Sequence, residues 1–282
     1  MLATFVIGLR EGLEAALIVG IIAAFLRQRG RADLLGRVWT GVSLAVILCL
    51  AAAIGLQFLN AKLPQQQQEE LETIVSIAAI GMVSYMVVWM QRHARELRRQ
   101  LEAAAAGALV SGSAWALVGM AFLAVLREGL ETAVFLLATF QASQNALLAS
   151  LGALPGILTA AGLGFGLYRG AVHIDLGKFF NATSLVLVLV AAGLVMTSLH
   201  TAHEAAWLNI AQAPLLDLTW LVRPGSVQAA VLTGMLGLQP RPTQIEAFGW
   251  LAYAALAVAF ILWPRRRTEG PSVSRSSPAV AA

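Results

Sequence analysis

Two copies of one charged motif lie inside apolar stretches of the chain, and they hold the residues best suited to chemistry. The sequence Leu-Arg-Glu-Gly-Leu-Glu occupies residues 9–14 and recurs at residues 126–131. In each copy the two glutamates are three residues apart and share one face of a helix, and the arginine lies four residues before the second glutamate. The candidate metal ligands are Glu11, Glu14, Glu128 and Glu131, and the candidate ion-pair or gating residues are Arg10 and Arg127.

The charge balance of the two motifs favours a cation as their ligand. A charged residue at the centre of a membrane-spanning helix costs roughly 2.5–3.5 kcal/mol, so six of them need partners. Two arginines against four glutamates leave two surplus negative charges if every group is ionised, and such a surplus must be protonated or balanced by a cation. Carboxylate oxygens are the ligands that hard metal cations prefer. The alternative is that the arginine–glutamate pairs only fix helix packing, although buried pairs stabilise a fold less than apolar packing does.

The composition predicts an all-α polytopic membrane protein. Of the 282 residues, 59% are hydrophobic and 12% are charged, against about 25% charged in soluble domains. The mean hydropathy is +0.76. These values exclude a soluble enzyme with one anchor, a disordered chain and a disulfide scaffold. The single cysteine, Cys49, forms no internal disulfide, and we interpret it as a small packing residue.

The apolar runs predict seven membrane-spanning helices. About 20 mostly apolar residues cross the hydrocarbon core, and a helix satisfies its own backbone hydrogen bonds there. The expected spans are residues 2–26, 38–59, 71–91, 113–140, 147–168, 179–202 and 247–263. Lysine and arginine concentrate in alternate loops, so the positive-inside rule places the N-terminus outside and the C-terminus in the cytoplasm.

Two segments outside the spans are expected to be irregular or short. Residues 205–246 are interpreted as an outer loop, because an eighth span at 205–223 would send the arginines at 265–267 outside. Within this loop, residues 226–238 are apolar but too short to cross, and they are expected to form a re-entrant or surface helix. The tail 265–282 is rich in serine and proline and is expected to be disordered in the cytoplasm.

The doubled motif predicts an internal duplication. Repeat one covers about residues 1–100, repeat two about residues 113–204, and the seventh span is an addition. Together they form one permease domain over residues 1–264. Because each repeat has an odd number of spans, the two repeats have opposite orientations in the membrane and are related by a pseudo-two-fold axis in its plane. Transporters place their polar site at the interface of such inverted repeats.

A second set of polar residues is predicted at the outer ends of two spans. His200, His203 and Glu204 lie on one side of a helix end and are candidate metal ligands, with an interfacial polar cap as the alternative. The candidate entrance residues at the start of the third span are Glu69, Glu70 and Glu72. Acidic residues also suit a helix N-terminus, which is the alternative for Glu69 and Glu70.

An exit site is predicted past the inner end of the third span. Its candidate residues are His93 and Glu96, and the alternative is a solvated basic helix end. The sequence has no phosphate-binding P-loop and no arrangement of serine, histidine and aspartate that suggests a nucleophile. We therefore expect a transporter rather than an enzyme.

The motif pair resembles the hallmark of the oxidase-dependent iron permeases, which include the yeast iron permeases and the bacterial ferrous-iron uptake permeases. The family's Arg-Glu-x-Leu-Glu motif in spans one and four stands here at residues 10–14 and 127–131. The seven-span plan with an outer N-terminus and the stretch 200–204 are similar to the bacterial branch. The resemblance covers roughly residues 1–264, and the additional acidic outer-loop motif of the yeast members is not evident.

The resemblance implies import of iron ions across the plasma membrane, which is the inner membrane of a bacterial cell. It implies that iron is a substrate bound by Glu11, Glu14, Glu128 and Glu131, with no permanently bound cofactor. It also implies separate partner proteins, namely an extracytoplasmic iron oxidase or peroxidase and a periplasmic metal-binding protein, besides the lipid bilayer. A nucleic-acid partner is not expected, and a homo-oligomer is left open.

Two other functions remain as alternatives. The first is a transporter of another divalent cation, such as manganese, which the same oxygen ligands would bind. The second is a non-transporting structural or sensing subunit whose arginine–glutamate pairs only hold the two halves together. Competition between metals tests the first. Substitution of the charged pairs tests the second, because only stability would then change.

Overall fold

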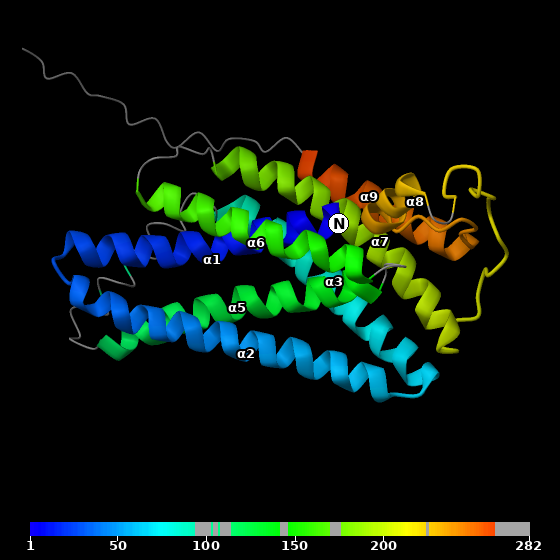
Figure 1. Cartoon of the computed structure of the whole chain (residues 1–282). Coiled ribbons are helices and arrows are strands. Elements are labelled where there is room, and N and C mark those ends of the chain that lie inside the picture. Colours follow the sequence, from blue (N-terminus) through cyan, green and yellow to red (C-terminus); the bar gives the residue numbers. More distant parts are fainter. Residues whose placement is uncertain are drawn as a thin grey trace, which may run out of the picture.

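The computed structural model describes residues 1–93, 103, 107, 114–141, 146–169, 176–223 and 226–262. Within this part of the chain the structure consists of helices and irregular segments, with no β-strand. The long helices are α1 (Leu2–Gln28), α2 (Leu35–Lys62), α3 (Gln65–His93), α5 (Ala114–Gln141), α6 (Ala146–Tyr168), α7 (Leu176–Glu204) and α9 (Gln244–Leu262). The short helices are η1 (Ala32–Leu34) and α8 (Val227–Leu236). The predicted all-α fold is confirmed for the described residues, and the helices form an elongated bundle (Figure 1).

Each predicted span coincides with one long helix. The helices extend beyond the apolar runs because polar residues continue the helical hydrogen bonding, as in α3, which begins at Gln65 rather than near residue 71. In the described chain, the segments that are long and apolar enough to cross a membrane are Ala32–Lys62, Gln65–Met90, Leu151–Tyr168 and Gly177–Glu204. α1 and α5 carry the charged motifs within their length, and α9 is a shorter apolar helix. The chain is therefore a helical membrane protein, and the crossing of all seven helices stays a prediction.

The surface of α2 is typical of a helix that faces lipid. α2 buries only a narrow strip of mostly small residues against the bundle. Its exposed side chains include the large apolar residues Leu44, Ile47, Ile54 and Phe58. A continuous apolar surface of this kind is rare on soluble proteins and marks contact with membrane or with another protein.

Three helix pairs make up the body of the protein. α1 packs most extensively against α6, α2 against α5, and α3 against α7, while α1 also crosses α5. α8 and α9 both contact α7 (Figure 1). The largest apolar core lies between α1, α3, α5 and α7 and includes Ile7, Val83, Phe135 and Leu187. This packing brings the two motif helices, α1 and α5, together in the interior.

Small residues at four-residue intervals let α2 and α6 approach the motif helices closely. They are Gly41, Ala45 and Cys49 in α2, and Gly152, Gly156 and Ala160 in α6. A Cβ atom at Gly41 would lie 2.8 Å from the carbonyl oxygen of Val118 in α5. A Cβ atom at Gly152 would collide with the carbonyl oxygen of Met1, at the start of α1. Spacing of this kind is typical of close helix contacts in membranes, and we did not predict its role from the sequence.

Where the structure describes it, the segment between α7 and α9 is irregular apart from α8, which lies within the apolar stretch predicted to form a short helix. α8 ends at Leu236 and is capped by Gly237, whose φ of +63° suits glycine and whose backbone lies against Gly193 of α7. In the part of the loop before α8, the hydroxyl and N–H of Thr219 donate to Asp217, and Arg241 lies beside the same carboxylate. These contacts hold the pKa of the exposed Asp217 below its ordinary value. The tail 265–282 lies outside the described residues, so its disorder stays a prediction.

Candidate metal centre

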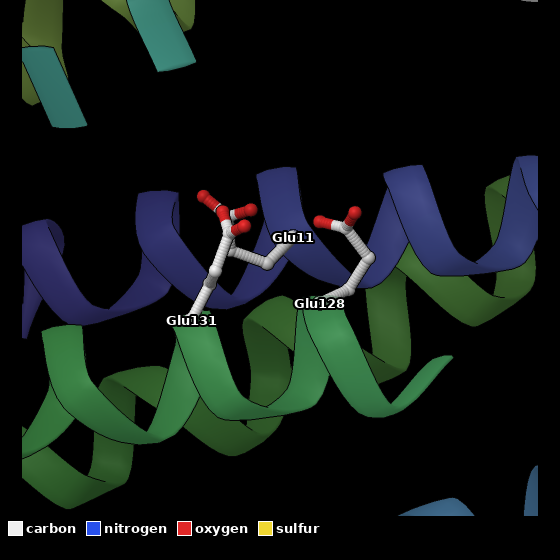
Figure 2. Close-up of side chains that lie close together, drawn as sticks. All are labelled: Glu11, Glu128 and Glu131. Carbon is white, nitrogen blue, oxygen red and sulfur yellow. The ribbon is translucent and has the colours of Figure 1, made fainter. Parts of the chain in front are cut away.

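The two motifs meet where α1 crosses α5, and their carboxylates converge there. Glu11 extends from α1, and Glu128 and Glu131 extend from α5 toward it (Figure 2). One carboxylate oxygen from each of the three residues lies within 4.8 Å of the other two. Glu11 and Glu128 are buried, and Glu131 is partly buried. This spacing lets three oxygens close on one cation after small side-chain rotations, since metal–oxygen distances are about 2.0–2.6 Å.

The fourth predicted ligand, Glu14, lies beside this group rather than within it. Glu14 is buried on α1, one turn beyond Glu11. Its charge interacts with those of Glu128 and Glu131 across the crossing. The helical spacing of the motif puts Glu11 and Glu14 on one face, as the sequence predicts. Glu11 belongs to the three-carboxylate group, and Glu14 lies within hydrogen-bonding reach of one of its members, Glu128.

Arg10 pairs with the glutamates of its own motif and also contacts a third helix. Its side chain is fully buried. The Nη1 atom lies 3.3 Å from Glu11 Oε1, and the Nη2 atom lies 3.6 Å from Glu14 Oε1. Nη1 also donates to the Sδ atom of Met86 in α3, at 2.9 Å. The pair with Glu14 follows from the motif spacing, whereas the contacts with Glu11 and Met86 were not predicted from the sequence.

Arg127 has a different environment, although it holds the same motif position. Its Nε atom donates to Glu131 Oε1 at 3.0 Å and lies 3.9 Å from Glu128 Oε1. Its guanidinium stacks over the ring of Trp89 in α3, 5.7 Å from the ring centroid. The side chain is 49% exposed, against 0% for Arg10. Both motif arginines therefore contact α3, and Arg10 is the more enclosed of the two.

Each of the four motif glutamates keeps one buried oxygen without a hydrogen-bond partner. These atoms are Glu11 Oε2, Glu14 Oε1, Glu128 Oε2 and Glu131 Oε2. A buried polar group left unpaired costs about 1–3 kcal/mol, and more when it is charged. These unpaired oxygens lie around one helix crossing and can donate lone pairs to a bound ion. A metal cation that prefers oxygen ligands fits this site.

The motif glycines allow the neighbouring helices to enclose the crossing. A Cβ atom at Gly12 would lie 2.9 Å from the Cβ of Ala160 in α6. A Cβ atom at Gly129 would lie 2.5 Å from the Sγ of Cys49 in α2. Because the two motifs meet equivalent small residues, both sides of the crossing are closed in the same way. Cys49 is buried, in agreement with its interpretation as a packing residue.

A second polar cluster, which we call the end cluster, lies where α3 begins, α7 ends and α9 begins. Its members are Glu69, Glu72, His200, Glu204 and Glu246. His200 donates from Nδ1 to Glu246 Oε1 at 2.9 Å, and its Nε2 atom lies 3.6 Å from Glu204 Oε1. Glu69 and Glu72 interact electrostatically with Glu204. The structure thus brings together four residues from the predicted outer set.

Two residues of the predicted outer set lie apart from the end cluster. The Nδ1 atom of His203 donates to the carbonyl oxygen of Leu208 at 2.9 Å, because the chain turns back over the end of α7. Glu70 makes no hydrogen bond or ion pair with the cluster in the described part of the chain. The predicted exit site falls largely outside the described residues: His93 ends α3, its side chain is not described, and Glu96 lies beyond the described range.

Glu246 belongs to the end cluster but was not among the predicted ligands. It is buried, with 1% of its surface exposed. Its Oε2 atom accepts a hydrogen bond from the backbone N–H of Thr243 at 2.9 Å, at the start of α9. The signal in the sequence is a threonine followed three residues later by glutamate before an apolar run, which is a capping box. The capping role leaves Oε1 free to orient His200.

Long apolar helices surround carboxylates that converge from two crossing helices. This arrangement defines a helical membrane protein with a site suited to cations. The chain belongs to the iron permease FTR1 family, whose sequence profile matches residues 1–268. It is 40% identical to the ferrous iron permease EfeU of Yersinia pestis over 276 residues, which cover 97% of this chain and 98% of the relative. It is 42% identical to the ferrous iron permease EfeU of Escherichia coli O6:K15:H31 over 279 residues, with 98% and 100% covered. The predicted resemblance is confirmed, and no solved structure matches the chain significantly.

Proposed function

We propose that this protein imports iron ions across the bacterial inner membrane and binds them at Glu11, Glu14, Glu128 and Glu131. The observation that carries the proposal is the three-carboxylate group, with one oxygen of each residue within 4.8 Å of the others. The unpaired buried oxygen on every motif glutamate supports it further. The relatives named ferrous iron permease support iron as the transported ion.

The charge of the site favours a divalent cation. Arg10 and Arg127 balance two of the four glutamates, so two negative charges remain when all are ionised. A divalent ion such as Fe²⁺ carries the two positive charges that balance this surplus. In the empty protein the arginines hold the glutamates together, and we expect Arg10 to move when the ion binds.

Two inverted repeats provide the path for alternating access. Residues 1–100 and 113–204 form the repeats, and α9 is the added span. The proposal is supported by matched packing: α1 lies on α6 as α5 lies on α2, and Gly12 meets Ala160 as Gly129 meets Cys49. Rocking of one repeat against the other would expose the crossing of α1 and α5 to each side in turn.

The ion path begins at the end cluster. With the N-terminus outside, this cluster lies on the outer face, where its carboxylates attract cations. Glu69, Glu72, His200 and Glu204 then form the entrance, and His93 and Glu96 line the exit. An extracytoplasmic iron oxidase or peroxidase and a periplasmic metal-binding protein deliver iron to this entrance.

Uptake of radioactive iron into proteoliposomes tests the proposed function. We expect wild-type protein to import Fe²⁺ and the Glu131→Gln variant to lose flux at least tenfold, since one ligand of a small set is replaced by a weaker one. Manganese and zinc are added as competitors, and a preference for manganese would establish the other divalent-cation function. Iron flux equal to wild type in Glu131→Gln would indicate that the motif only fixes helix packing and does not bind iron.

A further inference from the structure

Met86 lies beside the candidate metal centre, on a helix that carries neither motif. Its side chain is buried, with 1% of its surface exposed. Its Sδ atom accepts a hydrogen bond from Arg10 Nη1 at 2.9 Å. The same Nη1 atom lies 3.3 Å from Glu11 Oε1. One cationic nitrogen therefore sits between a thioether sulfur and a carboxylate oxygen.

The position of Nη1 is suitable for a metal ion. Met86 Sδ and Glu11 Oε1 both carry lone pairs, and both lie close to the positively charged Arg10 guanidinium. Metal–oxygen and metal–sulfur distances are about 2.0–2.6 Å, so a small inward movement of Met86 and Glu11 would place both atoms on a cation there. Arg10 thus holds, in the empty protein, a place that a metal ion can take.

Arg10 is held less firmly than Arg127. Its Nε and Nη2 atoms are buried and make no hydrogen bond, and Nη2 has only the 3.6 Å ion pair with Glu14. Arg127, by contrast, makes a 3.0 Å hydrogen bond to Glu131 and stacks on Trp89. A buried guanidinium with two nitrogens that make no hydrogen bond is the easier one to displace, because its contacts compensate only part of its desolvation.

We propose that an incoming cation displaces Arg10 Nη1 and binds Met86 Sδ together with Glu11, and that the thioether selects ferrous iron against harder cations. This inference rests on the proposed function, since it adds a ligand to the same site. Carboxylates alone do not separate Fe²⁺ from Mn²⁺ or Mg²⁺, whereas a soft thioether favours the later, softer metals. Ferric iron is harder than ferrous iron, so the same sulfur favours transport of the ferrous ion.

The matched variants Met86→Leu and Met90→Leu test the proposal. Both residues are buried in one apolar cluster with Phe180, and leucine conserves the volume of methionine. Of the three, Met86 is the residue that accepts a hydrogen bond from Arg10. The assay is uptake of Fe²⁺, kept reduced with ascorbate, into proteoliposomes in the presence of increasing Mn²⁺.

We expect the Mn²⁺ concentration that halves iron uptake to fall about tenfold or more in Met86→Leu, a loss comparable with that on removing a metal-site residue. Met90→Leu should behave as wild type. Unchanged competition in Met86→Leu, with normal iron uptake, would overturn the role of Met86 and leave the proposed function intact. A wild-type protein that imports no iron would overturn the proposed function itself.

X-ray absorption of Fe²⁺ bound to wild-type protein tests the ligand without any variant, so the proposal stays open to refutation even if Met86→Leu does not fold. We expect a sulfur scatterer at about 2.3–2.4 Å, near the metal–sulfur distances of other sites, and its loss in Met86→Leu. A shell of oxygen and nitrogen alone in the wild type would overturn the proposal.

Discussion

Replacing Gly12 by alanine adds a methyl group at a close contact between α1 and α6, beside the motif glutamates. The new Cβ atom would lie 2.9 Å from the Cβ of Ala160, whereas its other neighbours in Ile157 are 3.5 Å or more away. Carbon atoms attract each other at about 3.5–4.0 Å and repel strongly below that range. The two helices must therefore separate by roughly 0.6–1 Å at this point. Because the crossing of α1 and α5 lies next to this contact, the carboxylate group would be disturbed as well.

The magnitude follows from two opposing effects. Overpacking a tight contact costs about 1–3 kcal/mol, whereas replacing glycine by alanine within a helix gains up to about 1 kcal/mol. The helix effect is present in any background, but the collision disappears when Ala160 is replaced by glycine. We therefore expect a coupling energy of about 1–3 kcal/mol between Gly12→Ala and Ala160→Gly, within the range measured for contacting residues.

The assay is a double-mutant cycle of unfolding free energies for the detergent-purified protein. Gly20→Ala is the matched control in α1, because its Cβ atom would meet Tyr168 at an ordinary 4.0 Å. The control should be neutral or more stable by up to about 1 kcal/mol. Additive effects of Gly12→Ala and Ala160→Gly, with no rescue in the double variant, would refute the close packing of α1 on α6 and the matched-repeat packing built on it.

Further predictions concern the second motif, the arginines, the end cluster and the loop. Gly129→Ala should be partly rescued in stability by Cys49→Ala, measured by the same cycle, because this change removes the Sγ atom at 2.5 Å and leaves the Cβ atom at 3.2 Å. Arg10→Gln should destabilise the protein by about 3–5 kcal/mol, because it leaves buried carboxylates unpaired, and Arg127→Gln should lower the thermal stability less. Arg10→Gln should also change the affinity for iron. Unchanged iron affinity and transport in Arg10→Gln would contradict the gating role of Arg10. Glu246→Gln should lower iron uptake at limiting iron concentration, because His200 loses its charged hydrogen-bond partner. Glu70→Gln, outside the end cluster, should leave uptake unchanged. Equal uptake in the two variants would show that the end cluster is not part of the ion path. NMR titration should give the carboxyl of Asp217 a pKa below its ordinary value, and this pKa should move toward the ordinary value in Thr219→Val. The loop contacts should be fully present above the ordinary pKa and should weaken as the pH falls through the lowered pKa. An unshifted pKa of Asp217 would contradict these contacts.

The positions of the helices and the shared face within each motif were predictable because both depend on local sequence. Apolar runs set where a helix lies, and helical spacing brings Arg10 to Glu14 and Arg127 to Glu131. The partial failure at His203 also has a local origin. The spacing of His200, His203 and Glu204 predicts one set, but α7 ends at Glu204, and the reversed chain offers the Leu208 carbonyl to His203 instead.

The contacts between distant helices were not predictable from one sequence. Nothing near Met86 or Trp89 in the sequence indicates that a motif arginine reaches them, because those contacts depend on how α3 packs against α1 and α5. The separation of Glu14 from the three-carboxylate group likewise depends on the angle at which α1 crosses α5. Only Glu246 and the small residues of α2 and α6 had a signal in the sequence, in a capping box and in four-residue spacing.

Equilibrium binding of radioactive Fe²⁺ to the detergent-purified protein tests the central claim most directly. The comparison is between wild type, Glu11→Gln, Glu131→Gln and the control Glu70→Gln, each checked for normal folding. We expect Glu11→Gln and Glu131→Gln to bind iron at least tenfold more weakly, while Glu70→Gln keeps wild-type affinity. Wild-type iron affinity in both motif variants would contradict a metal site at the crossing of α1 and α5.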